Sequence, residues 1–283
     1  MEFFDSHMHL DDEKFDLDRE EVIKKIYLAG VTKAIDIGTN LETSLKALEI
    51  ANAHDFIYAS CGLHPEELPQ EEEKMWKEIK KIKEIAIKNK KIVAIGEIGL
   101  DYYWKNDNKQ MQKNVFIEQI KLANELNLPI SVHTREAIDD TIEIIKNNKI
   151  KKSGVLHCCP FNPELVKHGL NSGLYIGFGG TCTFKNSKNA EKIVNIVPVN
   201  RILIETDSPY LAPEPLRGTR NDSSNLKYII QKLAEFKKIE PEELAKITYN
   251  NAYNLFLKEI EKNAWSKKRR FWWKFRRYNE KSK

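Results

Sequence analysis

Eight short apolar runs, each followed by a longer segment, constrain the fold of this 283-residue chain more than any other feature. The runs are rich in β-branched residues, as buried strands are, and most of the segments between them have apolar residues at helical spacing. The runs lie at residues 2–6, 33–39, 56–60, 91–97, 128–134, 153–158, 173–179 and 201–207. Strands that alternate with helices pair in parallel, and a count of eight favours a closed barrel over an open doubly wound sheet. We therefore predict an α/β fold, a TIM-like (β/α)8 barrel.

The charge of the chain divides it into two parts. Residues 264–283 hold nine Lys or Arg and one acid, a net charge of +8, whereas the whole chain has a net charge of +4. The part before this tail is therefore slightly acidic, so the overall charge does not by itself indicate a nucleic-acid-binding protein. We predict a barrel over residues 1–260 and a basic, aromatic tail over residues 261–283.

The N-terminal residues show no basic stretch followed by an apolar one, and no apolar run is long enough to span a membrane. The four cysteines are too few for a disulfide framework in a chain of this length. We therefore expect a cytoplasmic protein.

Histidines and carboxylates follow the predicted strands at their C-terminal ends. They are His7 and His9 after the first run, His64 after the third, Glu97 after the fourth, His133 after the fifth, His157 after the sixth and Asp207 after the eighth. The C-terminal ends of barrel strands share one rim, so these side chains are expected to converge. His7 and His9 are two residues apart, which places both on the same side of an extended strand. The pattern predicts a metal site on that rim.

The number of candidate ligands exceeds what one ion needs. Imidazole and carboxylate groups suit Zn²⁺, Mn²⁺ and related divalent ions, and one tetrahedral ion takes four ligands. We therefore predict two divalent ions, Mg²⁺, Mn²⁺ or Zn²⁺, which together activate a water for hydrolysis. A single histidine such as His133 is more often a packing residue, so the prediction rests on the joint placement. His54 and His168 lie in helical segments and are given no role, and Cys158 and Cys159 are expected to be buried, inert thiols.

Six motifs then give a family resemblance. They are DSHMHL, GLHP, GEIGLDYYW, SVHTREA, LHC and LIETDSPYLAPEPLRGTRN, in this order over roughly residues 1–258. The set resembles the TatD family of metal-dependent deoxyribonucleases. The resemblance implies a barrel of the amidohydrolase superfamily that cleaves phosphodiester bonds, typically as a 3′ to 5′ exonuclease, with DNA bearing accessible 3′ ends as its substrate. Two loops depart from the family pattern, at residues 158–161 and 222–223.

The resemblance also implies a role for each residue of the site. It implies that His7, His9 and Asp207 hold one ion, that His133 and His157 hold the second, and that Glu97 bridges them. Asp207 would also take a proton from the attacking water, and His64 would face the substrate phosphate.

Further substrate-binding candidates are Arg217, Arg220 and Tyr102. The arginines can bind phosphates bidentately, or pair with acids such as Glu214 and Asp222. Tyr102, with its neighbours Tyr103 and Trp104, can stack on unpaired bases or pack the barrel rim.

Two other functions stay open at this stage. One is hydrolysis of D-aminoacyl-tRNA, which would make tRNA the partner. The other is binding of nucleic acid or membrane by a protein with a vestigial site. The tail can contact nucleic acid or anionic lipid, or have no catalytic consequence. No obligate protein partner is predicted.

Overall fold

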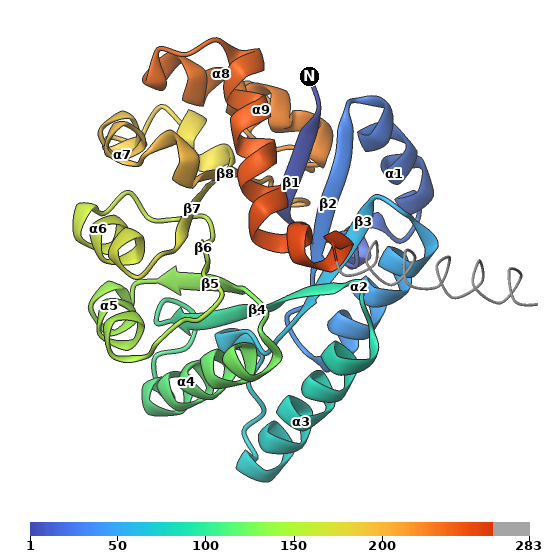
Figure 1. The fold of residues 1–283 in the computed structure, drawn as a ribbon, viewed down its shortest axis with the longest axis vertical. Coiled ribbons are helices and arrows are strands. Elements are labelled where there is room, and N and C mark those ends of the chain that lie inside the picture. The colour runs from blue at the N-terminus through green and yellow to red at the C-terminus, as the bar shows by residue number, and fades with distance from the viewer. Residues whose placement is uncertain (263–283) are drawn as a thin grey trace, which may run out of the picture.

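In the computed structural model, which describes residues 1–262, eight parallel strands form one sheet in sequence order (Figure 1). The strands are β1 (Phe3–Met8), β2 (Val31–Ile37), β3 (Ile57–Cys61), β4 (Ile92–Asp101), β5 (Ile130–Arg135), β6 (Gly154–Leu156), β7 (Tyr175–Phe178) and β8 (Ile202–Ile204). Just beyond β8, the backbone N–H of Asp207 donates to the carbonyl of His7 over 2.9 Å, so the last strand returns to the first. The predicted barrel is confirmed.

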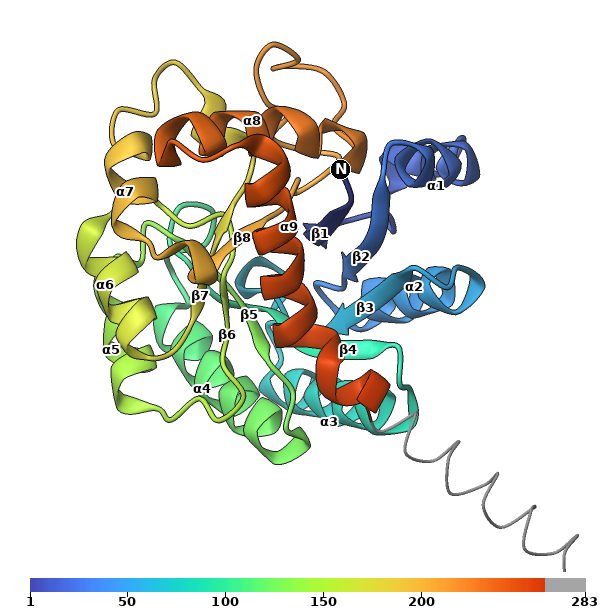
Figure 2. The ribbon, with the colours of Figure 1, turned by 45° about the horizontal axis from the view of Figure 1, so that its top comes forward.

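The helices surround the strands in chain order (Figures 1 and 2). They are α1 (Arg19–Leu28), α2 (Leu41–Ala53), α3 (Glu72–Lys88), α4 (Lys109–Leu126), α5 (Ile138–Asn147), α6 (Pro163–Asn171), α7 (Ala190–Ile196), α8 (Leu226–Lys237) and α9 (Pro241–Ala252), which continues into the π-helical turn η6 (Tyr253–Leu257). Short 3-10 turns are η1 (Glu13–Phe15), η2 (Pro65–Glu67), η3 (Gly180–Thr183), η4 (Val199–Arg201) and η5 (Ser223–Asn225). Local sequence sets several boundaries. For example, Pro163 and Pro241 open α6 and α9, where a missing N–H costs no hydrogen bond.

Two apolar clusters hold the elements together. The larger one packs the strands against the surrounding helices. The smaller one joins strand residues such as Phe4, Val93 and Leu203 to Leu255 and Phe256 of η6. The helix α9, with η6, therefore covers one end of the barrel (Figure 2). The other end is left for polar side chains.

No helix within residues 1–262 is long and apolar enough to cross a membrane. The chain is helical up to Lys262, and the basic, aromatic segment at residues 264–283 lies outside the described residues.

Candidate metal centre

The predicted ligands meet around Glu97. Its carboxylate oxygens lie between 3.0 and 3.9 Å from a ring nitrogen of five histidines, namely His7, His9, His64, His133 and His157. Asp207 completes the group, because its Oδ1 lies 3.4 Å from Nε2 of His9 and 3.5 Å from Nε2 of His157. His54 and His168, to which the sequence analysis gave no role, lie elsewhere, beside Glu20 and Glu164 respectively. The strand order thus brings together residues that are up to 200 positions apart.

Glu97 lies within its strand and not at the end of it, which corrects the sequence-based expectation. Strand β4 extends four residues further, to Asp101. Ile95 pairs with Ile130 of β5 and Ile98 pairs with Val132, so β4 advances three residues while β5 advances two. Such a bulge changes the direction of a side chain in mid-strand, and here Glu97 is the residue redirected toward the histidines.

Contacts on the far side of three imidazole rings orient them as ligands. Nδ1 of His9 lies 3.0 Å from the carbonyl oxygen of Ile37, which can only accept, so the proton of a neutral ring is on Nδ1 and the lone pair is on Nε2. His133 and His157 likewise contact a buried carboxylate through the nitrogen that faces away from Asp207 or Glu97. The distances are 2.9 Å from Nε2 of His133 to Asp101 and 3.0 Å from Nδ1 of His157 to Glu205. Metal-binding histidines are commonly held in this way.

His64 has the opposite proton arrangement. The backbone N–H of Glu66 donates to its Nδ1 over 3.2 Å, so the proton of the neutral ring is on Nε2. Burial lowers the pKa of His64 to about 3, which keeps the ring neutral near pH 7. Its Nε2 lies 3.7 Å from Oε1 of Glu97. This N–H suits a contact with an anionic oxygen better than a bond to a cation. The Nδ1 of His7 contacts the hydroxyl of Ser131 at 3.3 Å, which can donate or accept.

The electrostatic potential of the site favours cations. Burial alone would lower the pKa of His9, but Asp207 and Glu97 outweigh it and raise the pKa to about 10. Burial is also outweighed at His133, by Asp101 and Glu97, and at His157, by Glu205 and Asp207, so that both pKa values rise to about 9. A divalent ion bound by the same nitrogens would replace these protons.

The carboxylates show the converse effect. Burial would raise the pKa of Glu97, but the surrounding imidazoles, first of all that of His7, and the hydrogen bond from His133 hold it well below its usual range. The pKa of Asp207 is lowered in the same way, against the effect of burial, by the charge of His157 and the hydrogen bond from His9. Both groups are therefore ionised at neutral pH, as metal ligands must be.

The donor atoms fit divalent ions in more than one grouping. His7, His9 and Asp207 offer donors within 4.8 Å of one another. His64, Glu97 and His133 lie equally close together, but the proton on Nε2 of His64 leaves Glu97 and His133 as the donors of that group. His157 groups with Asp207 and Cys158 instead of with His133. Burial raises the pKa of the Cys158 thiol well above its usual range, so without a metal ion this sulfur is a protonated thiol. Nitrogen and oxygen donors of this kind match the preferences of Zn²⁺ and Mn²⁺.

The sequence analysis did not identify two carboxylates that orient ligand histidines, Asp101 and Glu205. Both side chains are fully buried, and each contacts the far nitrogen of a ligand histidine. The signal was present, since each acid lies at or directly after a strand and within a recognised motif. It was not decisive, because the sequence does not show which histidine an acid will contact.

The predicted substrate-binding residues have other partners here. Arg220 makes a two-pronged ion pair with Asp18, with Nη1 to Oδ1 at 2.8 Å and Nη2 to Oδ2 at 2.5 Å, and it does not pair with Glu214 or Asp222. Arg217 is exposed and lies over the ring of Phe184.

Tyr102 is buried and donates its hydroxyl hydrogen to Asp140 over 2.6 Å. The structure therefore does not place Tyr102 where a base can stack on it. Its neighbours Tyr103 and Trp104 are exposed.

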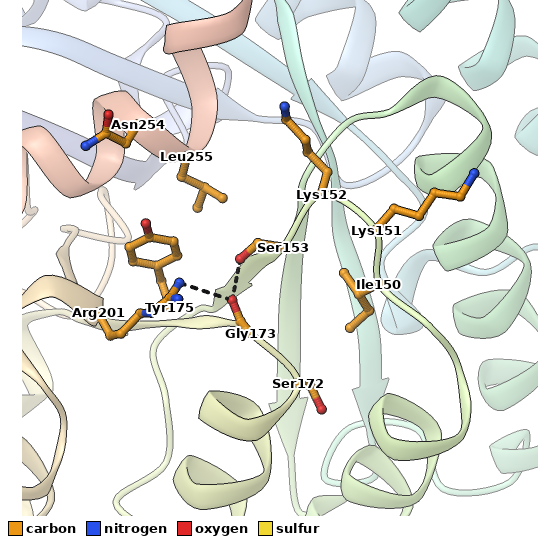
Figure 3. A pocket seen from close by; sticks show the side chains of 10 residues that line it. All are labelled: Ile150, Lys151, Lys152, Ser153, Ser172, Gly173, Tyr175, Arg201, Asn254 and Leu255. Carbon is orange, nitrogen blue, oxygen red and sulfur yellow. Dashed lines mark hydrogen bonds between the residues drawn. The ribbon is translucent and has the colours of Figure 1, made fainter.

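A cavity of about 400 Å³ lies at the opposite end of the barrel from these ligands. It is formed by residues at or just before the N-terminal ends of β6, β7 and β8 and by η6, and none of the candidate ligands lines it (Figure 3). Ser153 and Arg201 both donate to the carbonyl of Gly173 inside it (Figure 3). The cavity is therefore separate from the metal centre.

Comparison with known proteins gives a consistent set of relatives. The family model described as TatD related DNase matches residues 4–257. The chain is 41% identical over 256 residues to an uncharacterized metal-dependent hydrolase of Bacillus subtilis, YabD, which covers 89% of this chain and 98% of that protein. It is 31% identical over 260 residues to the 3'-5' ssDNA/RNA exonuclease TatD of Salmonella typhimurium, with coverages of 89% and 98%. The crystal structure of YjjV, a TatD homologue of Escherichia coli, superimposes with a TM-score of 0.84 at 28% identity, with coverages of 90% and 97%.

Proposed function

Because this chain belongs to the TatD family of metal-dependent hydrolases, we propose that it removes nucleotides from accessible 3′ ends of DNA, using a water activated by two divalent ions. The Salmonella relative is named as an exonuclease of single-stranded DNA and RNA, which supports a nucleic-acid substrate. That the chain is a metal-dependent hydrolase follows from its family.

The central position of Glu97 is the observation that carries this proposal. Its Oε2 lies 3.3 Å from Nε2 of His7, and its Oε1 lies 3.0 Å from Nδ1 of His133. The two oxygens therefore face different ligand histidines, as a carboxylate between two cations would. When bound, such a pair of ions lowers the pKa of a water and stabilises the charge that develops on a phosphodiester.

The residues of the chain supply the remaining steps. Asp207 is ionised and its side chain is 17% exposed, so a water can reach it and transfer a proton to it. His64 presents its Nε2–H toward the same space and would donate to a non-bridging oxygen of the phosphate. The contact with His9 holds Asp207 in place and the backbone N–H of Glu66 holds His64, which limits the reorganisation needed during the reaction.

The test compares three substrates in one assay. The metal-loaded protein is incubated with single-stranded DNA, duplex DNA and D-aminoacyl-tRNA, in parallel with an Asp207→Asn variant. We expect DNA that shortens from its 3′ end in a metal-dependent manner, with the activity lost in the variant. Intact DNA with rapid deacylation would establish the tRNA function instead, and inactivity on all three would favour a binding protein with a vestigial site.

A count of bound ions tests whether the site holds two divalent ions. Elemental analysis of the protein after equilibration with Mn²⁺ or Zn²⁺ and removal of free metal should give two ions per chain. A single ion in a fully active enzyme would refute the two-ion site and leave the hydrolase assignment intact.

A further inference from the structure

Exposed aromatic side chains gather at the catalytic end of the barrel. Within residues 1–262, the exposed aromatic residues are Tyr27, Tyr103, Trp104 and Tyr210. Three of these four follow the C-terminal ends of β4 and β8, and only Tyr27 lies elsewhere, in the last turn of α1. Trp104 is the most exposed, at 59%. Large aromatic faces left open to water beside a catalytic site indicate a ligand that covers them.

Tyr103, Trp104 and Arg135 form one continuous surface. The rings of Tyr103 and Trp104 meet edge to face, with centroids 4.7 Å apart. The guanidinium of Arg135, at the end of β5, lies 4.0 Å from the centroid of Tyr103 and 5.4 Å from that of Trp104. Its side chain makes no hydrogen bond or ion pair with any other part of the chain that the structure describes. Its charge is therefore available to a ligand.

One buried carboxylate connects this surface to the metal centre. Oδ1 of Asp101 accepts hydrogen bonds from the backbone N–H groups of Tyr103 and Trp104, over 2.9 and 2.8 Å. The other oxygen of Asp101 lies 2.9 Å from Nε2 of His133. The backbone of Tyr102 also donates to the carbonyl of Arg135 over 2.9 Å. The aromatic surface is thus held at a fixed position relative to a ligand histidine.

We propose that Tyr103, Trp104 and Arg135 form a subsite that stacks one unpaired nucleobase beside the phosphodiester to be cleaved. Arg135 would bind a neighbouring backbone phosphate through the N–H groups that the tyrosine ring leaves open. This inference rests on the proposed function. Stacking accepts every base, because each base has an aromatic face. A base inside a duplex is already stacked and paired, so the subsite selects single-stranded ends without selecting sequence.

A purely structural role explains only part of this arrangement. Tyr103 does pack against Arg135. Trp104, however, is the most exposed of the aromatic residues after β4, so it buries little apolar surface that could stabilise the fold. Burial raises the pKa of Glu66 and the nearby charge of Arg135 partly offsets this, yet the two side chains form no ion pair. An arginine such as Arg135, unpaired beside the catalytic site of the proposed nuclease, is suited to bind a phosphate.

The experiment uses the full chain, loaded with metal, and two oligonucleotides. One is an unstructured single strand, and the other has the same length but abasic sites at its 3′-terminal nucleotides. We expect Trp104→Ala to lower kcat/KM on the normal strand by about tenfold. It should change kcat/KM on the abasic strand far less, since no base remains to stack. Trp104→Phe should recover most of the loss, and Arg135→Gln should lower activity on both strands.

Tyr27→Ala is the matched control, because it removes an exposed aromatic ring far from the rim. It should cleave both strands as the wild type does. Equal losses for Trp104→Ala on the two strands, or no loss on either, would overturn the subsite while the nuclease function stands.

Binding separates the subsite from the proposed function. The affinity of the Asp207→Asn protein for both strands is measured by fluorescence anisotropy, with and without Trp104→Ala. The subsite requires tighter binding of the normal strand, and this preference must disappear with Trp104. If the wild type cleaves neither strand, the nuclease proposal is wrong, and the binding preference alone then decides for or against the subsite.

Discussion

The N-terminal and C-terminal ends of the barrel strands bury side chains of opposite character. At the N-terminal end, Phe4 and Leu203 pack against Leu255 and Phe256 of η6. At the C-terminal end, His7 is buried as completely as Phe4, but its neighbours are ionisable groups. Apolar burial stabilises the fold, whereas burial of a charged group costs free energy unless a partner offsets it.

This division separates stability from chemistry. The apolar end can hold the strands in register while the polar end keeps charges close together for catalysis. The cavity beside η6 shows that a hollow is not in itself a catalytic site, because its lining carries none of the metal-ligand candidates (Figure 3). Changes at each end should therefore have separable effects.

The largest effect is expected from Glu97→Gln at the polar end. This change removes the negative charge that lies among five imidazoles and replaces one of the two carboxylate oxygens that face them with an NH2 group, which cannot bind a cation. We expect kcat/KM to fall by about 10³-fold or more, and bound metal to fall below the wild-type value. Steady-state kinetics and elemental analysis measure the two quantities.

Lys152→Ala is the control for this variant, since Lys152 lines the cavity at the other end. It should retain wild-type activity and metal content. A Glu97→Gln protein with full activity would remove the basis of the bridging role.

Phe4→Ala should give the converse result at the apolar end. Phe4 is 1% exposed and contacts Tyr249 and Phe256 through ring centroids 5.9 and 6.3 Å away. Truncation should lower the free energy of unfolding by about 3–5 kcal/mol through lost burial and a residual cavity. Urea unfolding with a chelator present measures this loss, and calorimetry measures metal affinity. A loss of metal affinity of more than a few fold in the folded variant would show that the two ends are coupled.

Glu205→Gln tests whether the carboxylate behind a ligand sets its affinity. The amide can donate a hydrogen to Nδ1 of His157, which would place the proton of the ring on Nε2, where the ion must bind. We expect metal affinity to fall by about 10- to 100-fold with the fold retained. Competition with a metal-binding dye measures the affinity. An unchanged affinity would mean that Glu205 serves only the packing of the barrel.

The raised imidazole pKa values predict a pH dependence of metal binding. Without metal, His9 titrates at about 10, and His133 and His157 at about 9, so all three carry protons at pH 7. Each must lose its proton to bind an ion, so affinity should rise with pH up to that range. Calorimetry in buffers of different ionisation enthalpy should show protons released on binding at pH 7. Binding without proton release would contradict the raised pKa values of these three histidines.

The same shifts have a defined sign for stability without metal. A raised pKa in the folded state stabilises the fold below the ordinary histidine pKa near 6.5, and this contribution is lost as pH rises through about 9–10.

The sequence alone predicted the strands well, because β-branched runs and helical spacing are local signals. It also predicted which ligands converge, because parallel strand order fixes which residues share a rim. The redirection of Glu97 was not predictable, since a bulge depends on the register between β4 and β5. The proton position on His64 depends on a backbone N–H, which no residue type encodes.

The three aromatic residues after β4 show the same limit. The sequence analysis named Tyr102 as the candidate for stacking, together with its neighbours Tyr103 and Trp104. Tyr102 is buried because its hydroxyl reaches Asp140, which lies 38 residues away on α5. A contact at that distance along the chain decides which ring faces solvent, and local sequence gives no indication of it.

The smallest effect is expected from Arg220→Ala, a residue at the polar end but outside the metal centre. Its guanidinium is already paired with Asp18 and with the carbonyl of Lys14, so it is not free to bind a phosphate. We expect kcat/KM on DNA to change by less than about threefold, because exposed ion pairs contribute little. Arg217→Ala is the informative partner, since Arg217 has no ion pair within residues 1–262 and should cause the larger loss if either arginine binds substrate. A tenfold loss for Arg220→Ala alone would mean that Arg220 leaves Asp18 for the substrate, and that the polar end reaches further around the rim than the metal ligands do.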